Sequence, residues 1–396
     1  MKYCSRIYNY LYLDSYEGNA MICPWMEPSQ CSIGNILDST VEEIWNGEKA
    51  NKLREQFKQG CLDYCRKEAC PYIQNNILKD IEDENEYMAI SQTKLRPEVV
   101  NLAYDSVCNQ YCETCRSKVF IPPKNYKEKM DTIRERITPY INTAKEINAS
   151  GHGDPFASPY MMDLLSGLRP IDKNFTILLE TNGVFFDEEH WERIKHLGNY
   201  NLKVVLTSNS FEEFTYKHIN RGGNYKKLMH NLMFIKTLKE NNLIKKYSSS
   251  FVIQDRNFRE IPSFIERSLN EFGFDDVVLK PVYQWGTMPE AVFWMKDVLN
   301  PLHPYHQEYL EILEHPILKD PRVFNFGGDM MHPCREYPAK IVKETVVQKE
   351  TVIEKVNVPV ESEKISTTRK ALAHIVSSFI PQKALRRKFR NKIMNS

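Results

Sequence analysis

The sequence predicts an α/β fold in which helices cover a mainly parallel sheet, preceded by a small α+β module and followed by a basic helical tail. Short apolar strands alternate with helical segments between Glu98 and Gly286. Nine of the ten cysteines lie before residue 116, whereas residues 369–392 hold eight Lys or Arg residues and no acid. With 396 residues and 42% apolar content, the chain can bury one full core and still form a second module.

Composition limits the partners and the compartment. Lys and Arg total 53 against 52 Asp and Glu, so the chain as a whole has no strong positive electrostatic field that would attract nucleic acid. Nucleic acid is therefore not expected as a partner. The first ten residues lack an apolar core of secretory length, and no later run of about 18 apolar residues could span a bilayer. We therefore expect a cytoplasmic protein whose clustered cysteines bind metals or clusters instead of forming disulfides.

The cysteine-rich first module, residues 1–90, combines a hairpin with two helices. Its predicted elements are a hairpin of residues 6–13 and 21–23, a short helix opened by a capping box of Ser39 and Glu42, and a helix of residues 48–59 that stops at Gly60. Cys4 and Cys23 then lie at the open end of the hairpin. Three more cysteines follow the second helix in a short loop: Cys61, Cys65 and Cys70.

Residues 95–290 read as six strand-helix units in series. The strands are expected at residues 99–103, 146–149, 175–179, 202–206, 249–253 and 277–280, and the helices include residues 161–168, 225–240 and 261–271. Such a series forms a parallel sheet, either doubly wound or closed part of the way into a barrel, with ligands at the carboxyl ends of the strands. The later parts are a C-terminal extension of this core, a linker or arm, and the basic tail: residues 291–340, 341–368 and 369–396.

Three closely spaced cysteines follow the first of these strands. Cys108, Cys112 and Cys115 stand within eight residues, so their thiolates can hold one four-iron cluster and leave its fourth iron open. An open iron suits a cluster that binds and reduces a substrate. A zinc site and an electron-transfer cluster are the alternatives, but both usually have four protein ligands, and a fourth would have to come from far away.

This segment resembles the signature of the radical SAM family, Cys-x3-Cys-x2-Cys after the first strand of a partial (β/α)6 barrel. The resemblance implies that S-adenosylmethionine chelates the open iron through its amino and carboxylate groups. An electron from the reduced cluster then breaks the S to C5′ bond, and the 5′-deoxyadenosyl radical takes a hydrogen atom from the substrate. A reductant such as ferredoxin or flavodoxin is implied as a partner. Thr114 departs from the pattern, because many members carry an aromatic residue there.

The resemblance continues at the ends of later strands, where it implies contacts to S-adenosylmethionine. The segment Ser150-Gly-His-Gly-Asp-Pro155 is similar to the family's glycine-rich segment, although His152 and Asp154 replace the commonest residues. Glycines there let backbone groups approach the ligand. The residues expected to contact S-adenosylmethionine are Gly151, Gly153, Asp154, Asn182, Ser208 and Arg221. The alternative is ordinary turn chemistry at these positions, or a solvent-exposed side chain for Arg221.

The first module resembles the SPASM or twitch module, an auxiliary iron-sulfur domain that in most relatives follows the barrel, whereas here it precedes it. The resemblance implies one auxiliary four-iron cluster, with the ligands Cys4, Cys23, Cys65 and Cys70. Seven cysteines outside the triad are too few for two such clusters. The spare thiols expected are Cys31 and Cys61. Cys334 is expected to be a structural thiol, and the alternatives are that it completes a ligand set or lies near the substrate. A zinc-binding module is the alternative for the same four ligands.

The tail holds apolar residues at helical spacing, followed by a basic run that ends at Lys392. Such a segment can lie on the inner face of an anionic membrane, as a peripheral contact, or dock as a helix on the protein itself. Residues 379–388 are also similar to the tails of bacterial enzymes that build surface polysaccharides.

Together these features predict a radical SAM enzyme that abstracts hydrogen from a peptide or a sugar-containing substrate. The first module favours peptide modification, and the tail favours cell-surface polysaccharide biosynthesis. The alternative is a non-catalytic iron-sulfur or zinc protein that carries electrons or scaffolds partners. The sequence names no acid or base for the reaction, so the catalytic residues are left open.

Overall fold

A computed structural model gives the architecture of residues 2–26, 31–67, 70–74, 76, 78–90, 96–149, 152–284 and 287–325. All of these fall within one compact unit that ends at Pro338. Gly151, Cys334 and the expected arm and tail lie outside the described residues. In the described ranges no helix is both long enough and apolar enough to span a bilayer.

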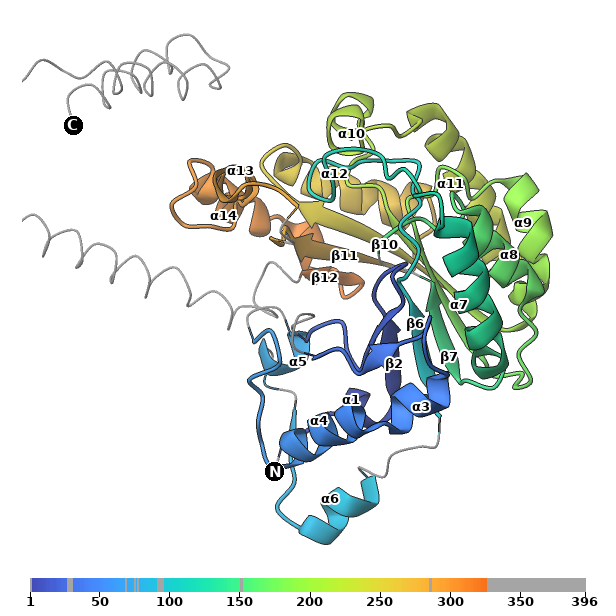
Figure 1. Cartoon of the computed structure of the whole chain (residues 1–396). Helices are drawn as coiled ribbons and strands as arrows, with labels where there is room; N and C mark the ends of the chain where they lie inside the picture. The colour runs from blue at the N-terminus through green and yellow to red at the C-terminus, as the bar shows by residue number, and fades with distance from the viewer. Residues whose placement is uncertain are drawn as a thin grey trace, which may run out of the picture. The chain divides into compact units, whose positions relative to one another are not determined.

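One ten-stranded sheet organises the described chain (Figure 1). Its order is β12-β11-β10-β9-β8-β7-β6-β2-β3-β4, and every neighbouring pair from β12 to β2 is parallel. The strands of the α/β part are β6 (Val99–Leu102), β7 (Glu146–Ala149), β8 (Thr176–Thr181), β9 (Asn201–Thr207), β10 (Lys246–Ile253), β11 (Asp276–Pro281) and β12 (Val323–Asn325). The strands β6 to β11 confirm the six strands predicted from the sequence, and β12 is an additional strand.

Helices cover one face of this sheet, as Figure 1 shows. They are α7 (Tyr126–Ile141), α8 (Pro159–Gly167), α9 (Glu188–Ile194), α10 (Glu213–Ile219), α11 (Tyr225–Glu240) and α12 (Ile261–Glu266). The predicted helix of residues 261–271 is α12 followed by a π-helical turn, Arg267–Glu271. After the barrel come α13 (Glu290–Lys296) and α14 (His306–Leu313).

The sheet is an open, partial barrel. Its two edge strands, β12 and β4, do not pair with each other in the part of the chain that the structure describes. Along β9 the side chains alternate, with Leu202, Val204 and Leu206 buried and the residues between them half-buried. Since successive side chains of a strand point to opposite faces, only one face of β9 is packed tightly. The other face leaves room at the inner side of the sheet.

The first module is joined to this sheet. Its strands β2 (Tyr10–Leu13) and β3 (Asn19–Met21) form the predicted hairpin, and β4 (Gly34–Asn35) pairs with β3. The first residues of the predicted strand form a short helix instead, α1 (Arg6–Asn9). Because β2 pairs in parallel with β6, its carboxyl end reaches the sheet edge from which the loop with the cysteine triad leaves.

The first predicted helix of the first module begins one residue later than expected, whereas the second begins at Glu48, as predicted. Thr40, and not Ser39, caps α3 (Val41–Asn46): its hydroxyl accepts from the Glu43 N–H at 3.2 Å, and Glu43 Oε2 accepts from the Thr40 N–H at 2.8 Å. Both registers fit the same sequence pattern, so the capping-box prediction was wrong by one residue. The remaining elements are α4 (Glu48–Lys58), α5 (Pro71–Gln74), α6 (Glu84–Ile90), and the pair β1 (Lys2–Tyr3) and β5 (Lys79–Asp80).

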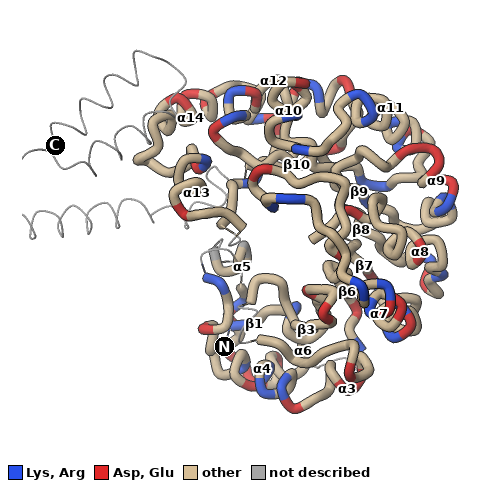
Figure 2. The backbone as a smooth tube through the Cα atoms, turned by 45° about the horizontal axis from the view of Figure 1, so that its top comes forward, with Lys and Arg blue, Asp and Glu red and all other residues tan. Residues whose placement is uncertain are grey.

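Charged residues of both signs are interspersed over the described chain (Figure 2). Ion pairs link many of them along the outer helices, such as Lys127 with Asp131 on α7 and Lys217 with Glu213 on α10. This mixture matches the net charge of +1. Specific electrostatic effects therefore come from local groups.

Candidate active site

The predicted triad lies in the loop between β6 and α7. The backbone N–H groups of Cys115 and Arg116 both donate to the Cys112 carbonyl oxygen, at 2.9 and 3.1 Å, and this turn folds the loop on itself. Burial raises the pKa of Cys108 to about 12, and the charge of Asp154 adds to the rise. Burial also raises the pKa of Cys112, and the neighbouring thiols of Cys115 and Cys108 add to it. Iron must therefore displace protons from Cys108 and Cys112 when it binds.

The arrangement of the triad fits a cluster better than a single ion. Among the described residues, no group of three His, Cys, Asp or Glu side chains could hold one metal ion as it stands. Yet the Cys115 thiol lies close enough to add to the raised pKa of both Cys108 and Cys112. In a four-iron cluster each thiolate binds a different iron, so the sulfur atoms can stay apart. Ligation of such a cluster by the triad stays a prediction that this geometry supports.

Two side-chain amides donate toward the sulfur atoms of the triad. Asn182 Nδ2 lies 3.9 Å from Cys108 Sγ, and Asn220 Nδ2 lies 3.8 Å from Cys112 Sγ. Hydrogen bonds to sulfur help to set the potential of a bound cluster. The sequence analysis singled out Asn182 as a contact to S-adenosylmethionine, but it missed Asn220, whose only signal is its place directly before Arg221.

The Arg221-Gly-Gly segment is hydrogen-bonded to the cysteine loop. The Tyr111 N–H donates to the Arg221 carbonyl at 2.9 Å, while the Arg221 side chain donates to the carbonyls of Tyr111 at 3.2 Å and Arg116 at 3.4 Å. A Cβ atom on Gly222, where φ is +82°, would lie 3.1 Å from the Asn109 carbonyl oxygen. The segment thus fixes the shape of the loop. Within the described residues Arg221 Nη1 makes no hydrogen bond, so it is available for a ligand carboxylate.

Gly153 packs against the base of the same loop. A Cβ atom there would lie only 2.4 Å from the Val107 carbonyl oxygen and 2.7 Å from that of Asp105, so a larger residue cannot fit without a shift of the backbone. The next N–H, that of Asp154, donates to the Val107 carbonyl at 2.9 Å. The glycine-rich segment therefore lies beside the cysteine loop, as contact of both with one ligand requires. Gly151, the other predicted contact, lies outside the described residues.

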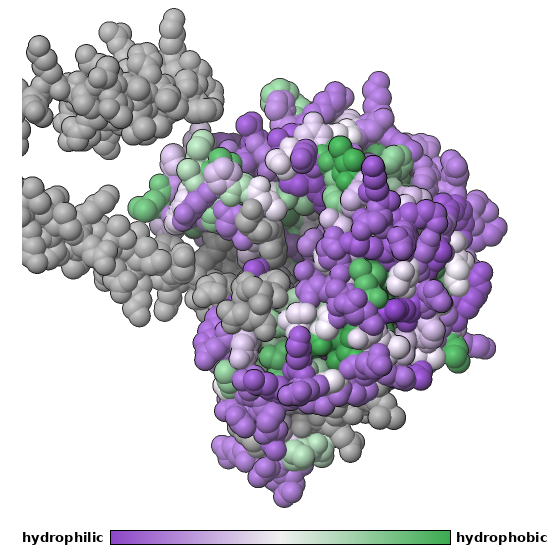
Figure 3. Space-filling view, in the orientation of Figure 1, coloured by the Kyte–Doolittle hydropathy of each residue, from purple (hydrophilic) through white to green (hydrophobic). Residues whose placement is uncertain are grey.

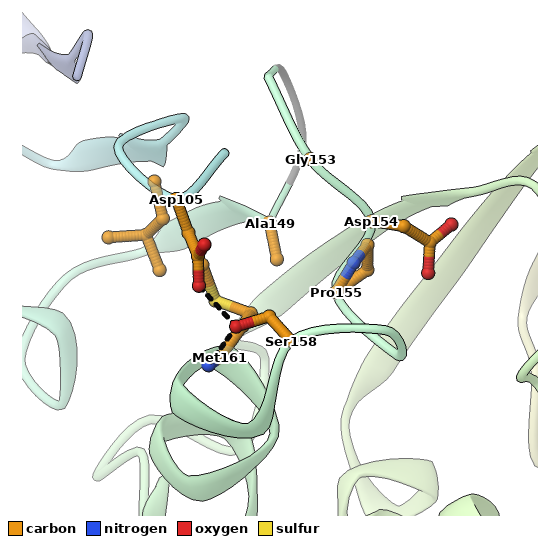
Figure 4. A pocket seen from close by; sticks show the side chains of 8 residues that line it. Asp105, Ala149, Gly153, Asp154, Pro155, Ser158 and Met161 are labelled. Carbon is orange, nitrogen blue, oxygen red and sulfur yellow. Dashed lines mark hydrogen bonds between the residues drawn. The ribbon is translucent and has the colours of Figure 1, made fainter. Parts of the chain in front are cut away.

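A small cavity lies at the base of the glycine-rich segment (Figure 4). Asp105 lines it, and its carboxylate accepts hydrogen bonds from Ser158 Oγ and, at 2.6 Å, from Tyr126 Oη. Ser158 also caps α8 by accepting from the Met161 N–H at 3.2 Å. In Figure 4 the Asp154 carboxylate points away from this group. Because Asp105 and Ser158 in its lining are hydrogen-bonded to each other, we assign this cavity a structural role.

The Asp154 carboxylate joins the ends of β7 and β8. One oxygen accepts from Thr181 Oγ1 at 2.9 Å and the Asn182 N–H at 2.8 Å, and the other accepts from the N–H groups of Phe156 at 3.0 Å and Ala157 at 3.3 Å. Burial raises the pKa of Asp154, and these hydrogen bonds oppose the rise. Four donors fill the acceptor sites of the carboxylate. In this arrangement Asp154 positions the glycine-rich segment against Asn182.

Asp154→Asn is expected to destabilise the protein by about 2 kcal/mol. The NH2 group of the new amide would face N–H and O–H groups that donate hydrogen bonds to the carboxylate, so donors would face donors. Asp163→Asn is the control, since it removes an exposed carboxylate on α8 that lies 2.8 Å from Arg193, a pair expected to contribute less than about 1 kcal/mol. Urea unfolding of both iron-free variants measures the difference. If Asp154→Asn is no less stable than the control, the network does not hold the site together.

Buried polar side chains without partners gather at two neighbouring strand ends. Ser208 follows β9, and its Oγ has no hydrogen-bond partner among the described residues. The same holds for Ser250 Oγ in β10, which pairs in register with Thr207, and for both amide atoms of Gln254 just beyond β10. Buried polar groups are normally satisfied, so these atoms fit a polar ligand such as S-adenosylmethionine. The sequence analysis missed Ser250 and Gln254, because nothing in the strand sequence marks them.

The first module contains a second, small cavity. Its lining includes all four cysteines predicted to hold the auxiliary cluster: Cys4, Cys23, Cys65 and Cys70. An isolated β-bridge between Met26 and Cys65, and a 2.9 Å hydrogen bond from the Arg66 N–H to the Trp25 carbonyl, tie the hairpin end to the loop after α4. Burial raises the pKa of Cys65 to about 12, and the neighbouring thiols add to the rise. These four thiols fit one iron-sulfur cluster.

The two cysteines predicted to be spare, Cys31 and Cys61, do not line this cavity. Cys61 Sγ is 3.8 Å from Asp63 Oδ2, and Cys31 Sγ is 3.8 Å from the Tyr64 carbonyl oxygen. Cys31 also contributes to the raised pKa of Cys65, but it does not line the cavity.

Helix α13 is tied to the triad loop. The buried ammonium of Lys296 lies 2.9 Å from Glu113 Oε1, and Glu113 stands directly after Cys112. Lys296 also lies 3.6 Å from Asp255 Oδ1, while Arg256 Nε lies 3.2 Å from the other oxygen of Glu113. The sequence analysis missed this link, because its members are far apart in the chain.

The comparisons with known proteins agree with this geometry. Residues 106–267 match the Radical SAM superfamily, and residues 4–71 match SPASM, described as an iron-sulfur cluster-binding domain. The first match implies a four-iron cluster with S-adenosylmethionine, and the second implies auxiliary iron-sulfur binding. No curated protein matches the chain.

Two solved structures are similar to the chain at low identity. SuiB of Streptococcus suis, bound to S-adenosylmethionine, gives a TM-score of 0.40 at 12% identity over 82% of this chain and 71% of its own. Histidine-tagged anSMEcpe with bound AdoMet gives 0.32 at 15% identity over 54% of this chain and 61% of its own. From the two family matches, residues 106–267 form a radical SAM domain and residues 4–71 an N-terminal SPASM iron-sulfur domain.

Proposed function

We propose that this chain is a radical SAM enzyme that abstracts a hydrogen atom from a peptide. When bound, the cluster and S-adenosylmethionine supply a 5′-deoxyadenosyl radical. The observation that carries the proposal is the contact of the triad loop with both the glycine-rich segment and the Arg221-Gly-Gly segment. There Cys108, Cys112 and Cys115 hold the cluster, and Arg221 keeps their loop in shape.

An exposed apolar surface beside the triad loop favours a peptide as the substrate. Trp294 and Met295 on α13 are 41% and 57% exposed, and Lys296 of the same helix pairs with Glu113 in the loop. Figure 3 shows hydrophobic residues on the surface over α13 and α14. Clustered exposed apolar side chains mark sites that bind other macromolecules. Such a surface suits the side chains of a peptide better than the hydroxyl groups of a sugar.

Trp294→Ser is expected to lower hydrogen transfer from substrate severalfold, with little change in uncoupled cleavage of S-adenosylmethionine, because the side chain lies outside the triad loop. A buried interfacial Trp is typically worth about 2 kcal/mol or more of binding. The control is Ile171→Ser, which removes a 77% exposed apolar side chain ahead of β8. Deuterium transfer from labelled substrate into 5′-deoxyadenosine measures the effect. Equal rates of hydrogen transfer in the two variants would show that α13 is not part of the surface that binds the substrate.

A fractionation experiment separates a peptide substrate from a sugar-containing one. Reconstituted enzyme is incubated anaerobically with extract from cells grown in deuterated medium, and deuterium in 5′-deoxyadenosine is followed by mass spectrometry. For a peptide substrate, protease treatment of the extract abolishes transfer and periodate treatment spares it. The reverse result would establish the second candidate, a sugar-containing substrate in cell-surface polysaccharide biosynthesis, which the short resemblance of residues 379–388 favours.

The proposal extends to two partners: a ferredoxin or flavodoxin as reductant, and an anionic membrane surface for the basic tail. The tail lies outside the described residues, so its sequence alone supports the membrane contact. Truncation after Ser362 is expected to release the protein from anionic vesicles and to leave cleavage of S-adenosylmethionine intact. Cosedimentation with vesicles measures release, and unchanged binding would favour a docked helix.

A further inference from the structure

An arginine lines the auxiliary cavity together with its four cysteines. Arg6 stands two residues after Cys4, at the start of α1. Its guanidinium carbon lies 4.3 Å from the ring centroid of Tyr10 and 5.5 Å from that of Tyr72, and Tyr72 also lines the cavity. The two rings therefore hold a permanent positive charge at the wall of the space that the thiols share.

This charge has no counter-charge in the described protein. No carboxylate among the described residues lies within ion-pair distance of Arg6, and its Nε is buried without a hydrogen-bond partner. Arg54, the buried arginine of the same module, also has no carboxylate partner among the described residues and has a buried Nη2 without a hydrogen bond, but it donates to the carbonyls of Ile7 and Trp45 and does not line the cavity. A partly buried charge is costly unless it is paired. The partner of Arg6 is therefore expected inside the cavity.

A four-iron cluster held by four thiolates is negatively charged, and it gains one more negative charge when it takes up an electron. A fixed cation beside it stabilises the reduced form more than the oxidised form, and net charge around a cluster is one determinant of its potential. The effect persists in a partly buried cavity, where solvent and salt screen the interaction little.

We propose that Arg6 is the built-in counter-charge of the auxiliary cluster and raises its reduction potential, so that the module is adapted to accept an electron. The inference rests on the proposed function, since it requires the auxiliary cluster. It assigns a role to a residue outside the set of ligands. Arg6 acts through the cluster, because its positive charge beside the four thiols changes the reduction potential of the cluster.

The test uses the full chain with Cys108, Cys112 and Cys115 all replaced by Ala, so that only the auxiliary cluster is present. Arg6→Gln and Arg6→Lys are compared in this background, with Lys52→Gln as the control, because Lys52 is an exposed cation on α4 outside the cavity lining. After anaerobic reconstitution, iron and zinc are counted, and the midpoint potential is measured by redox titration followed by electron paramagnetic resonance.

At a fixed potential, Arg6→Gln is expected to lower the ratio of reduced to oxidised cluster about tenfold or more, which for a one-electron couple is a shift of about 59 mV. Arg6→Lys should keep most of the parent potential, and Lys52→Gln should keep all of it. Iron loss in Arg6→Gln alone, with full loading in Arg6→Lys, also supports the need for a charge.

Three results would overturn the inference. Full iron loading of Arg6→Gln at the parent potential means that the charge does not act on the cluster. Iron loss in both Arg6 variants means that the shape of arginine, and not its charge, is required. Zinc in place of iron in the parent background removes the auxiliary cluster itself, and this failure of the proposed function is visible before any change at Arg6.

Discussion

Cys112→Ala is expected to abolish formation of 5′-deoxyadenosine from S-adenosylmethionine while the auxiliary module keeps its iron. Cys112 is half-buried at the turn of the triad loop, where two backbone N–H groups donate to its carbonyl oxygen. Loss of its thiolate leaves two ligands, too few to retain a four-iron cluster. The module loses nothing, because its four cysteines line a separate cavity.

The measurement pairs an iron count with chromatography of 5′-deoxyadenosine after reduction. Cys61→Ala is the matched control, since Cys61 lies in the same chain but lines neither cavity. Loss of all iron in Cys112→Ala would show that the two sites depend on each other. Undiminished cleavage would show that the triad does not hold the active cluster.

Cys65→Ala is expected to lower the iron content by about four atoms and to leave the triad cluster in place. It should impair substrate turnover more than uncoupled cleavage of S-adenosylmethionine, since the auxiliary module does not contribute to the triad. The fold should also loosen, because Cys65 pairs with Met26 across the bridge that ties the loop to the hairpin.

Iron and zinc analysis tests the prediction for Cys65→Ala. Substrate turnover and uncoupled cleavage of S-adenosylmethionine are measured side by side in the same variant. Cys61→Ala again serves as the control and should keep the full iron content. Stoichiometric zinc in protein purified without oxygen, with iron only at the triad, would make the module a structural zinc site.

The sheet could be predicted from the sequence where local pattern decides the structure. The strands β6 to β11 are short apolar runs separated by helical segments, and each lies within a few residues of its expected position. The capping box was misplaced by one residue, because Ser39 and Thr40 both stand three residues before a glutamate. The place of β2 beside β6 was not predicted, since pairing between distant strands leaves no trace in a local pattern.

In the site, too, local sequence predicts some features, whereas contacts between distant segments determine the others. Spacing was enough to group the triad, and the resemblance to the SPASM module grouped the four module cysteines, which line one cavity. It could not show that Asp154 binds four protein donors, or that Asn220 points at Cys112. Those roles depend on where loops meet in space. Lys296 is the extreme case, because its partner Glu113 lies in a different part of the chain.

The central claim is that the chain cleaves S-adenosylmethionine by one-electron reduction, and the most direct test is anaerobic reconstitution followed by reduction with dithionite. Mass spectrometry then follows 5′-deoxyadenosine in the presence of S-adenosylmethionine. We predict formation of 5′-deoxyadenosine that depends on reductant and on Cys112. A protein fully loaded with iron that forms none under these conditions would contradict the account and leave the chain an electron carrier or scaffold.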